Sequence, residues 1–260
     1  MVRHRGKYNR ENNSPYELSR SRIENYIKCP ACFYLQQVNG VIFPSFPGFN
    51  LNEATDVLLK RDFDKYRGHT NTHPFLIKNG KDYLIPFYHK NFELWTQSIH
   101  FASEGRMNFV HEPTNLKVGG GLDDIWLNKK TNELHIVDYK STSQRTEGKK
   151  ISLNDPWKIS YKRQMDFYAW VMLKKGFNIS RIGFFLYCDG DRFGNYTFLN
   201  SDYAKMNFNI TLIEYNVDFS WVEDTLFEIK NCLNLNSVPN HSDSCEYGKF
   251  ISQVELINQK

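Results

Sequence analysis

The chain has 260 residues, of which 40% are hydrophobic and 24% charged, and 33 Lys and Arg against 29 Asp and Glu give a formal charge of +4. This composition is typical of a globular protein and excludes a disordered chain, a collagen and a coiled coil. With no apolar run that could span a bilayer, no secretory signal and an odd number of cysteines, five, we expect a cytoplasmic protein with reduced thiols and no membrane partner.

The N-terminal region is polar and basic. Residues 1–18 predict a flexible basic arm. Residues 19–30 predict a short helix that Pro30 ends. Because no internal repeat or long linker follows, we expect residues 19–260 to form a single domain.

Helical and strand patterns alternate along the rest of the chain. Apolar residues recur at helical spacing over 51–67, and residues 84–100 predict a strand or turn followed by a helix. The further elements are a hairpin over 115–142, a helix over 157–175, strands over 179–188 and 208–215, a helix over 218–235, and an irregular or short-helical tail over 237–260. This alternation predicts an α/β fold.

The hairpin places two acids side by side. With residues 129–132 as its loop, Asp123 faces Asp138, and Lys140 lies on the same face because side chains alternate along a strand. Asp124 lies on the other face, and a register slipped by one residue would reverse that choice. Facing carboxylates repel unless a cation lies between them, and Mg²⁺ or Mn²⁺ suits such ligands. Surface ion pairs at an edge hairpin are the alternative.

Three further residues are candidates for the same site. Gln164 and Tyr168 are spaced i, i+4 on one helix face, where they could contact a phosphate or an attacking water. Asp56, on the helix over 51–67, could complete a metal shell. Packing against the sheet and an exposed helical acid are the respective alternatives. A metal here would activate water beside a phosphodiester, and Lys140 would stabilise the developing charge.

Taken in order, these segments resemble the RecB-type branch of the PD-(D/E)XK nuclease superfamily, which includes CRISPR-associated and AddB-like exonuclease domains. The matching segments are 19-SRSRIENYIKCPACFYL-35, 51-LNEATDVLLKRDF-63, 121-GLDD-124, 138-DYK-140 and 164-QMDFY-168. The last two match the family's (D/E)-x-K and Gln-x-x-x-Tyr motifs. The resemblance implies a restriction-endonuclease-like core, a small mixed β-sheet flanked by α-helices.

The resemblance also implies roles for the candidate residues. The implied metal ligands are the carboxylates of Asp56, Asp123 and Asp138 and the carbonyl of Tyr139. Lys140 would be the catalytic lysine, and Gln164 and Tyr168 would be positioning residues. Asp56 stands where many relatives have a histidine ligand, and aspartate also binds magnesium. The implied cofactor is Mg²⁺ or Mn²⁺, and the implied substrate is single- or double-stranded DNA.

Many relatives carry cysteines near both ends that hold an iron–sulfur cluster or zinc. Here Cys29, Cys32, His241 and Cys245 could form a Cys₃His zinc site. Cys232 could instead provide the fourth ligand of an iron–sulfur cluster. Thiols without a metal are the alternative.

Basic residues on the helix over 157–175 suggest contact with a phosphate backbone. We expect Lys158, Lys162 and Arg163 to bind DNA, with a solvated helix face as the alternative. The leading hypothesis is a metal-dependent DNA nuclease acting in repair, recombination or mobile-element or CRISPR DNA processing. The alternatives are a DNA-binding module that does not cut, and a subunit that acts only with a helicase or another DNA-processing chain.

Overall fold

The computed structural model describes residues 7–44, 48–98 and 101–258, and its contacts divide the chain into two compact units. Unit 1 comprises residues 1–46, 98–120 and 220–260, and unit 2 comprises residues 47–97 and 121–219. The single domain expected for residues 19–260 stays a prediction.

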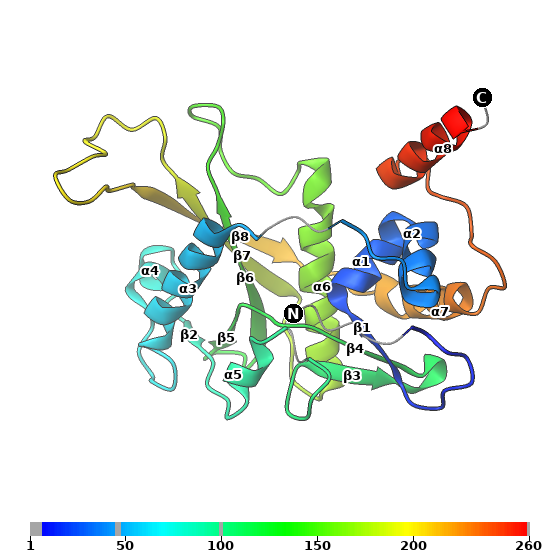
Figure 1. The fold of residues 1–260 in the computed structure, drawn as a ribbon. Helices are drawn as coiled ribbons and strands as arrows, with labels where there is room; N and C mark the ends of the chain where they lie inside the picture. Colours follow the sequence, from blue (N-terminus) through cyan, green and yellow to red (C-terminus); the bar gives the residue numbers. More distant parts are fainter. Residues whose placement is uncertain (1–6, 45–47, 99–100, 259–260) are drawn as a thin grey trace. The chain divides into compact units, whose positions relative to one another are not determined.

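Unit 2 is built on a mixed sheet of five strands in the order β2-β5-β6-β7-β8 (Figure 1). Its strands are β2 (Leu84–Pro86), β5 (Asp124–Asn128), β6 (Leu134–Thr142), β7 (Ile182–Gly190) and β8 (Phe208–Asn216). Within this sheet only β6 and β7 pair in parallel, and both are interior, mostly buried strands. They are rich in aliphatic and aromatic residues, as buried strands are.

Helices cover this sheet. They are α3 (Asn50–Asp64), α4 (Pro74–Lys78), α5 (Phe92–Trp95), the 3₁₀ turn Pro156–Lys158 and α6 (Ile159–Lys174). Phe63 of α3 stacks near Trp126 and Tyr139 in the core. Helix α6 lies close to β7 because Gly183 has no side chain: a Cβ there would lie 2.1 Å from the Met165 sulfur. The end of β6 contacts both helices, because Ser141 bonds to Asp56 of α3 and Asp138 bonds to Gln164 of α6.

Unit 1 combines a three-stranded sheet with helices. The strands, in the order β1-β4-β3, are β1 (Tyr16–Ser19), β4 (Leu116–Gly119) and β3 (Asn108–His111). The helices are α1 (Arg20–Lys28), α2 (Pro30–Tyr34), the π-helix Leu35–Asn39, the 3₁₀ turn Glu112–Thr114, α7 (Trp221–Leu233) and α8 (Glu246–Asn258). A Cβ at Gly119 would lie 2.3 Å from the Met107 carbonyl oxygen, so this glycine permits close strand packing.

Several boundaries differ from those that the sequence predicts. Residues 16–18 of the expected arm form β1, because they pair with β4, and Tyr8 is buried with its hydroxyl donating to Asn234. Residues 1–6 lie outside the described part. The helix expected before residue 100 is only α5, and residues 99–100 are likewise not described. In the tail, α8 is longer than the expected short helix. Among the described residues, no helix has the length and apolarity needed to cross a membrane.

Candidate active site and cysteine cluster

The β5–β6 hairpin has the predicted register. Ile125 pairs with Ile136 and Asp124 with Val137. The next position back on β5 is Asp123, whose Oδ2 accepts a 2.8 Å hydrogen bond from the Tyr139 backbone N–H. Asp123 is thereby tied to β6 beside Asp138.

Asp138 is the most deeply buried member of the site, with 2% of its surface exposed. Its Oδ1 accepts a 2.9 Å hydrogen bond from Gln164 Nε2 on α6. Its Oδ2 forms an ion pair with the Lys140 ammonium. One carboxylate oxygen is thus held by α6, while the other faces a cation.

Neighbouring charges shift the acid–base behaviour of this group. Burial, and after it the charge of Asp138, raises the pKa of Asp123 to about 8, although Lys140 and the Tyr139 N–H act in the opposite direction. Burial lowers the pKa of Lys140, but Asp138 and Asp123 more than offset it, so the net pKa is raised. Lys140 is therefore an ammonium at neutral pH, and Asp123 holds a proton more tightly than an exposed carboxyl does.

Asp124 points into a different environment from Asp123. It is fully buried and binds Arg67 at 2.8 Å. It also accepts hydrogen bonds from the Tyr139 hydroxyl at 2.7 Å and from Trp126 Nε1 at 3.2 Å. These bonds saturate its oxygens, so Asp124 anchors β6 from the opposite face and leaves Asp123 as the carboxylate beside Asp138.

Helix α3 brings a third acid to the end of β6. The Ser141 hydroxyl donates to Asp56 Oδ1 at 3.3 Å and also contacts the Thr55 hydroxyl. Burial raises the pKa of Asp56 to about 6, and the charge of Asp138 adds to the increase while Lys140 and Ser141 oppose it. Asp56 is thus within electrostatic reach of the other members.

The candidate site residues on and just before α6 lie in different surroundings. Gln164 reaches Asp138, whereas Tyr168 is buried and its ring lies 5.9 Å from that of Phe167. Lys158 is buried, with its ammonium bound to the Ser152 carbonyl at 2.7 Å and to Asp155 at 3.0 Å. Its ammonium is therefore already engaged within the protein, and its expected contact with DNA stays a prediction. Lys162 and Arg163 are half-buried.

Two side chains that the sequence analysis did not single out contact the site. Lys140 Nζ lies 4.8 Å from the centre of the Tyr161 ring, where its charge faces the aromatic ring. Tyr161 precedes Gln164 by three residues, a spacing that places both on one helix face. Ser141 follows Lys140 but points to α3, and only the tertiary packing reveals its contact with Asp56.

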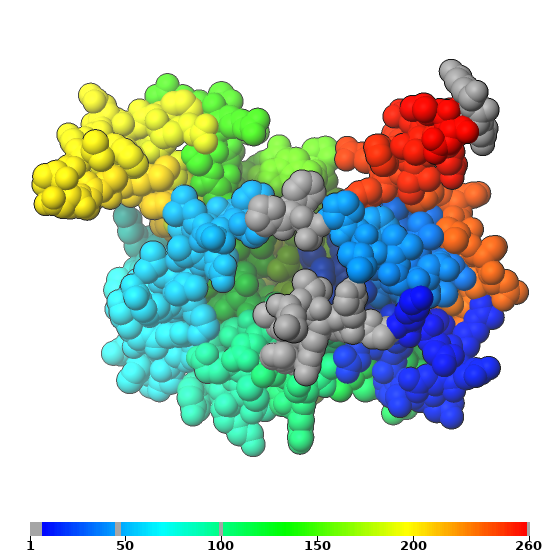
Figure 2. Space-filling model, viewed as in Figure 1, coloured from blue at the N-terminus to red at the C-terminus, as the bar shows by residue number. Residues whose placement is uncertain are grey.

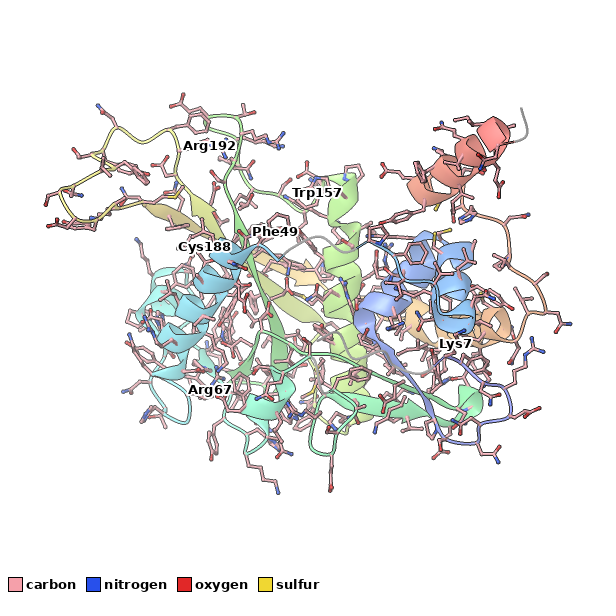
Figure 3. The ribbon with its side chains drawn as sticks, in the orientation of Figure 1. Lys7, Phe49, Arg67, Trp157, Cys188 and Arg192 are labelled. Carbon is pink, nitrogen blue, oxygen red and sulfur yellow. The ribbon has the colours of Figure 1, made fainter. Side chains whose placement is uncertain are left out.

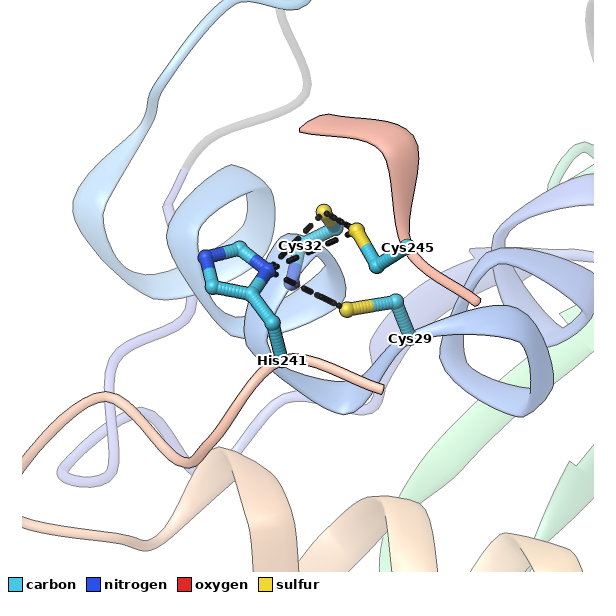
Figure 4. A group of neighbouring side chains, drawn as sticks. All are labelled: Cys29, Cys32, His241 and Cys245. Atoms are coloured by element: carbon cyan, nitrogen blue, oxygen red, sulfur yellow. Dashed lines mark hydrogen bonds between the residues drawn. The ribbon is translucent and has the colours of Figure 1, made fainter. Parts of the chain in front are cut away.

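The cysteine cluster lies within unit 1 (Figure 4). The ligand atoms of Cys29, Cys32, His241 and Cys245 all lie within 4.8 Å of one another. His241 Nδ1 is 3.4, 3.7 and 3.5 Å from the sulfurs of Cys29, Cys32 and Cys245, respectively. Cys232 lies outside this group, with its sulfur 3.9 Å from the Pro30 carbonyl oxygen. The structure thus assembles the predicted Cys₃His set.

The thiols of the cluster differ in acidity. Burial raises the pKa of Cys29, but hydrogen bonds from the backbones of Cys32 and Ser242 outweigh it and bring the pKa down to about 6. Burial and hydrogen bonds with Cys245 and Cys29 raise the pKa of Cys32. The Cys29 thiolate therefore forms readily, whereas the Cys32 thiol needs a nearby cation to lose its proton.

The profile of the PD-(D/E)XK nuclease superfamily matches residues 86–247, which is more than half of the chain. The chain belongs to this superfamily. No curated protein matches the sequence significantly. The PD-(D/E)XK match includes β5, β6 and α6, and the mixed sheet flanked by helices confirms the expected restriction-endonuclease-like fold. Members are metal-dependent phosphodiesterases, so membership implies a divalent cation and a nucleic-acid substrate.

The carboxylate group fits such a cation. Asp123, Asp138 and Asp56 offer hard oxygen ligands, and the Lys140 ammonium already lies against one oxygen of Asp138, where positive charge is stabilised. An additional positive charge would also relieve the repulsion that raises the pKa of Asp123. The residues present therefore suit Mg²⁺ or Mn²⁺.

Proposed function

We propose that the chain is a metal-dependent DNA nuclease that hydrolyses phosphodiester bonds with water. The observation that supports this most strongly is the ion pair between Lys140 and Asp138, with Asp123 and Asp56 in electrostatic contact. The metal would be held by the carboxylates of Asp56, Asp123 and Asp138 and the carbonyl of Tyr139. Bound there, Mg²⁺ or Mn²⁺ would supply Lewis acidity and a more acidic water.

The other residues have distinct parts in this proposal. Lys140 carries a fixed positive charge that stabilises the charge developing on the phosphate oxygens. Gln164 holds one oxygen of Asp138 and so fixes the direction of the other. Tyr139 is held on both sides, because its backbone N–H donates to Asp123 and its hydroxyl donates to Asp124. Its carbonyl oxygen accepts a 3.2 Å hydrogen bond from Lys140 Nζ.

We also assign the chain to the RecB-type branch, because the leader over 19–35 and the Gln-x-x-x-Tyr motif occur together. Its process would be DNA repair, recombination or mobile-element or CRISPR DNA processing, with or without a helicase partner on another chain. Gln164 supports this assignment through its contact with Asp138, and Tyr168 would help to position the substrate.

Cleavage of end-labelled single- and double-stranded DNA tests the proposal. Wild-type protein should cut in Mg²⁺ or Mn²⁺ and not in EDTA, and Lys140→Met should reduce the rate roughly 10²–10³-fold. Lys129→Met, an exposed lysine of the same hairpin, is the matched control and should cut normally. Folded wild-type protein that binds DNA in metal without cutting it would contradict the proposal and favour a silent or partner-dependent binding module.

We further propose that the cysteine cluster holds one zinc ion rather than an iron–sulfur cluster. Zn–S and Zn–N bonds of about 2.3 and 2.0 Å in a tetrahedron require sulfur–nitrogen separations of about 3.5 Å. The three sulfur–His241 distances average close to this value. A four-iron cluster attaches each ligand to a different iron and uses four cysteines. The compact Cys₃His set fits a single ion better.

Metal analysis of the purified protein tests this assignment. One zinc per chain is expected, and Co²⁺ should substitute with the absorption of a tetrahedral thiolate site. Cys245→Ser should lose the metal, whereas Cys232→Ser should keep it, because Cys232 lies outside the set. Bound iron with sulfide, lost in Cys232→Ser, would contradict the zinc assignment.

A further inference from the structure

Two hollows open beside the proposed nuclease site, at the end of β6. The first, of about 410 Å³, lies between α3 and the ends of β7 and β8, and Ser141 lines it. The second, of about 450 Å³, reaches the start of α6 and is lined by Tyr187, the register partner of Lys140. Thr142, Ser143 and Arg145 line both hollows, so the two adjoin at these residues, and together they are called the trough.

The trough is positively charged. Four basic side chains and one acidic side chain line it, namely Arg145, Lys149, Lys158, Arg192 and Asp155. Asp155 and the Ser152 carbonyl already hold the buried Lys158. Neither Arg145 nor Arg192 forms an ion pair with a described residue, and the Ser143 hydroxyl accepts a 2.9 Å hydrogen bond from Arg192. Two arginines thus remain available for phosphate oxygens.

An exposed tryptophan links the trough to the catalytic lysine. Trp157 lines the second hollow with 60% of its surface exposed, and Figure 3 labels it at the start of α6. Its ring lies 5.5 Å from that of Tyr161, over which Lys140 is placed. A base on Trp157 would therefore lie one aromatic ring away from Lys140.

Further aromatic side chains lie beyond the first hollow. The connection between β7 and β8 projects from unit 2 (yellow in Figure 2), and Phe193, Phe198 and Tyr203 on it are exposed. Phe208, at the start of β8, lines the first hollow itself. Exposed aromatic rings can stack on unpaired bases.

We propose that the trough binds single-stranded DNA, with Arg145 and Arg192 contacting phosphates and Trp157 stacking on a base. This inference rests on the proposed nuclease function and specifies its substrate. A basic groove with exposed aromatic rings is the arrangement that binds unpaired strands, because the faces of bases in a duplex are hidden by stacking. The strand would run past Ser141 and Lys140 with its phosphates toward the carboxylate site.

Binding without cleavage tests the proposal. In EDTA, fluorescence anisotropy of a labelled oligothymidine should show tighter binding than that of a blunt duplex of equal length. Trp157→Ala should weaken binding of the single strand roughly 5- to 100-fold. Tyr88→Ala, which removes an exposed ring outside the trough, should have no effect.

Salt dependence tests the arginines. The association constant K falls as salt rises, and Arg145→Ala should make this dependence shallower, reducing the magnitude of the slope of log K against log salt by about 0.7 for each phosphate contact that it removes. Lys90→Ala, an exposed lysine outside the trough, should leave the slope unchanged. Equal binding of duplex and single strand, or equal effects of Trp157→Ala and Tyr88→Ala, would overturn the inference. If wild-type protein still cut in a Lys140-dependent manner, the nuclease proposal would stand without the trough.

Discussion

The two candidate metal sites differ in almost every physical respect. The carboxylate site of unit 2 offers oxygen atoms and lies beside the trough, and the Lys140 ammonium contacts one oxygen of Asp138. The cysteine cluster of unit 1 offers three sulfurs and one nitrogen that already lie at the spacing of a filled coordination shell. Hard ligands with open positions favour exchangeable magnesium and catalysis, whereas a closed thiolate shell favours permanent zinc and stability.

The sites also differ in how far apart their ligands lie in the sequence. The carboxylates and Lys140 come mainly from one hairpin, with Asp56 and Gln164 added by two helices of the same unit. The cluster joins Cys29 and Cys32 to a segment more than 200 residues away in the sequence. Loss of the metal from the carboxylate site should therefore reduce cleavage, and loss of the metal from the cysteine cluster should destabilise the fold.

Removal of each metal separately should produce the largest contrast. A strong zinc chelator should lower the thermal unfolding temperature by about 10 °C, because structural zinc contributes several kcal/mol to folding. Removal of Mg²⁺ alone should abolish cleavage and change the unfolding temperature little. Differential scanning calorimetry of the two preparations measures this, and equal shifts would contradict the division of roles.

The next largest effect should come from Arg67→Met. This change leaves Asp124 buried without its cation, which should cost about 3–5 kcal/mol of folding free energy. Urea unfolding measures the cost. The double variant Arg67→Met with Asp124→Leu should recover part of it, and failure of the single variant to destabilise would show that Asp124 is not a structural anchor.

The register of the hairpin could be predicted from the sequence, because a four-residue loop fixes which residues pair. The choice of Asp123 over Asp124 follows from that register and agrees with the observed bonds of Asp124. The resemblance suggested the Cys₃His set but left Cys232 as another possible ligand, and only the tertiary packing separates the two. Lys158 was not, because a lysine on a basic helix gives no sign that Asp155 and the Ser152 carbonyl bind it.

The trough was likewise hidden from sequence reasoning. Arg145 and Arg192 lie in separate connections of irregular structure, and only the parallel pairing of β6 with β7 brings those connections together. Strand β1, within the arm that the sequence predicts to be flexible, was hidden for the same reason. A parallel pairing of β1 with β4, about 100 residues apart, leaves no local pattern.

A smaller effect is expected from Gln164→Leu. Loss of the hydrogen bond to Asp138 should reduce metal affinity or the cleavage rate about 10- to 100-fold, as is usual for residues that orient a metal ligand. Titration of cleavage with Mg²⁺ separates the two contributions. Gln253→Leu, at an exposed glutamine of α8, is a matched control, and an unchanged Mg²⁺ dependence together with an unchanged cleavage rate in Gln164→Leu would exclude a positioning role for Gln164.

The smallest effect should be seen in the pH dependence of the metal-free protein. Burial raises the pKa of Asp56 from 3.8 to about 6, so the folded state binds this proton more tightly than the unfolded state does. Stability should therefore fall as pH rises from about 4 to about 6. Asp56→Asn in EDTA should be slightly more stable than wild type above pH 6 and equal to it near pH 4. The opposite order in thermal unfolding would place Asp56 outside the carboxylate group.

The most direct test of the central claim is the single-turnover cleavage rate of Asp138→Asn in saturating Mg²⁺, measured on protein whose zinc content is determined in parallel. The account predicts a rate at least about 10³-fold below wild type, since the substitution removes a ligand charge from a preorganised site. It also predicts unchanged zinc content and near-normal unfolding. A wild-type rate in Asp138→Asn would contradict the assignment of the carboxylate group as the catalytic centre.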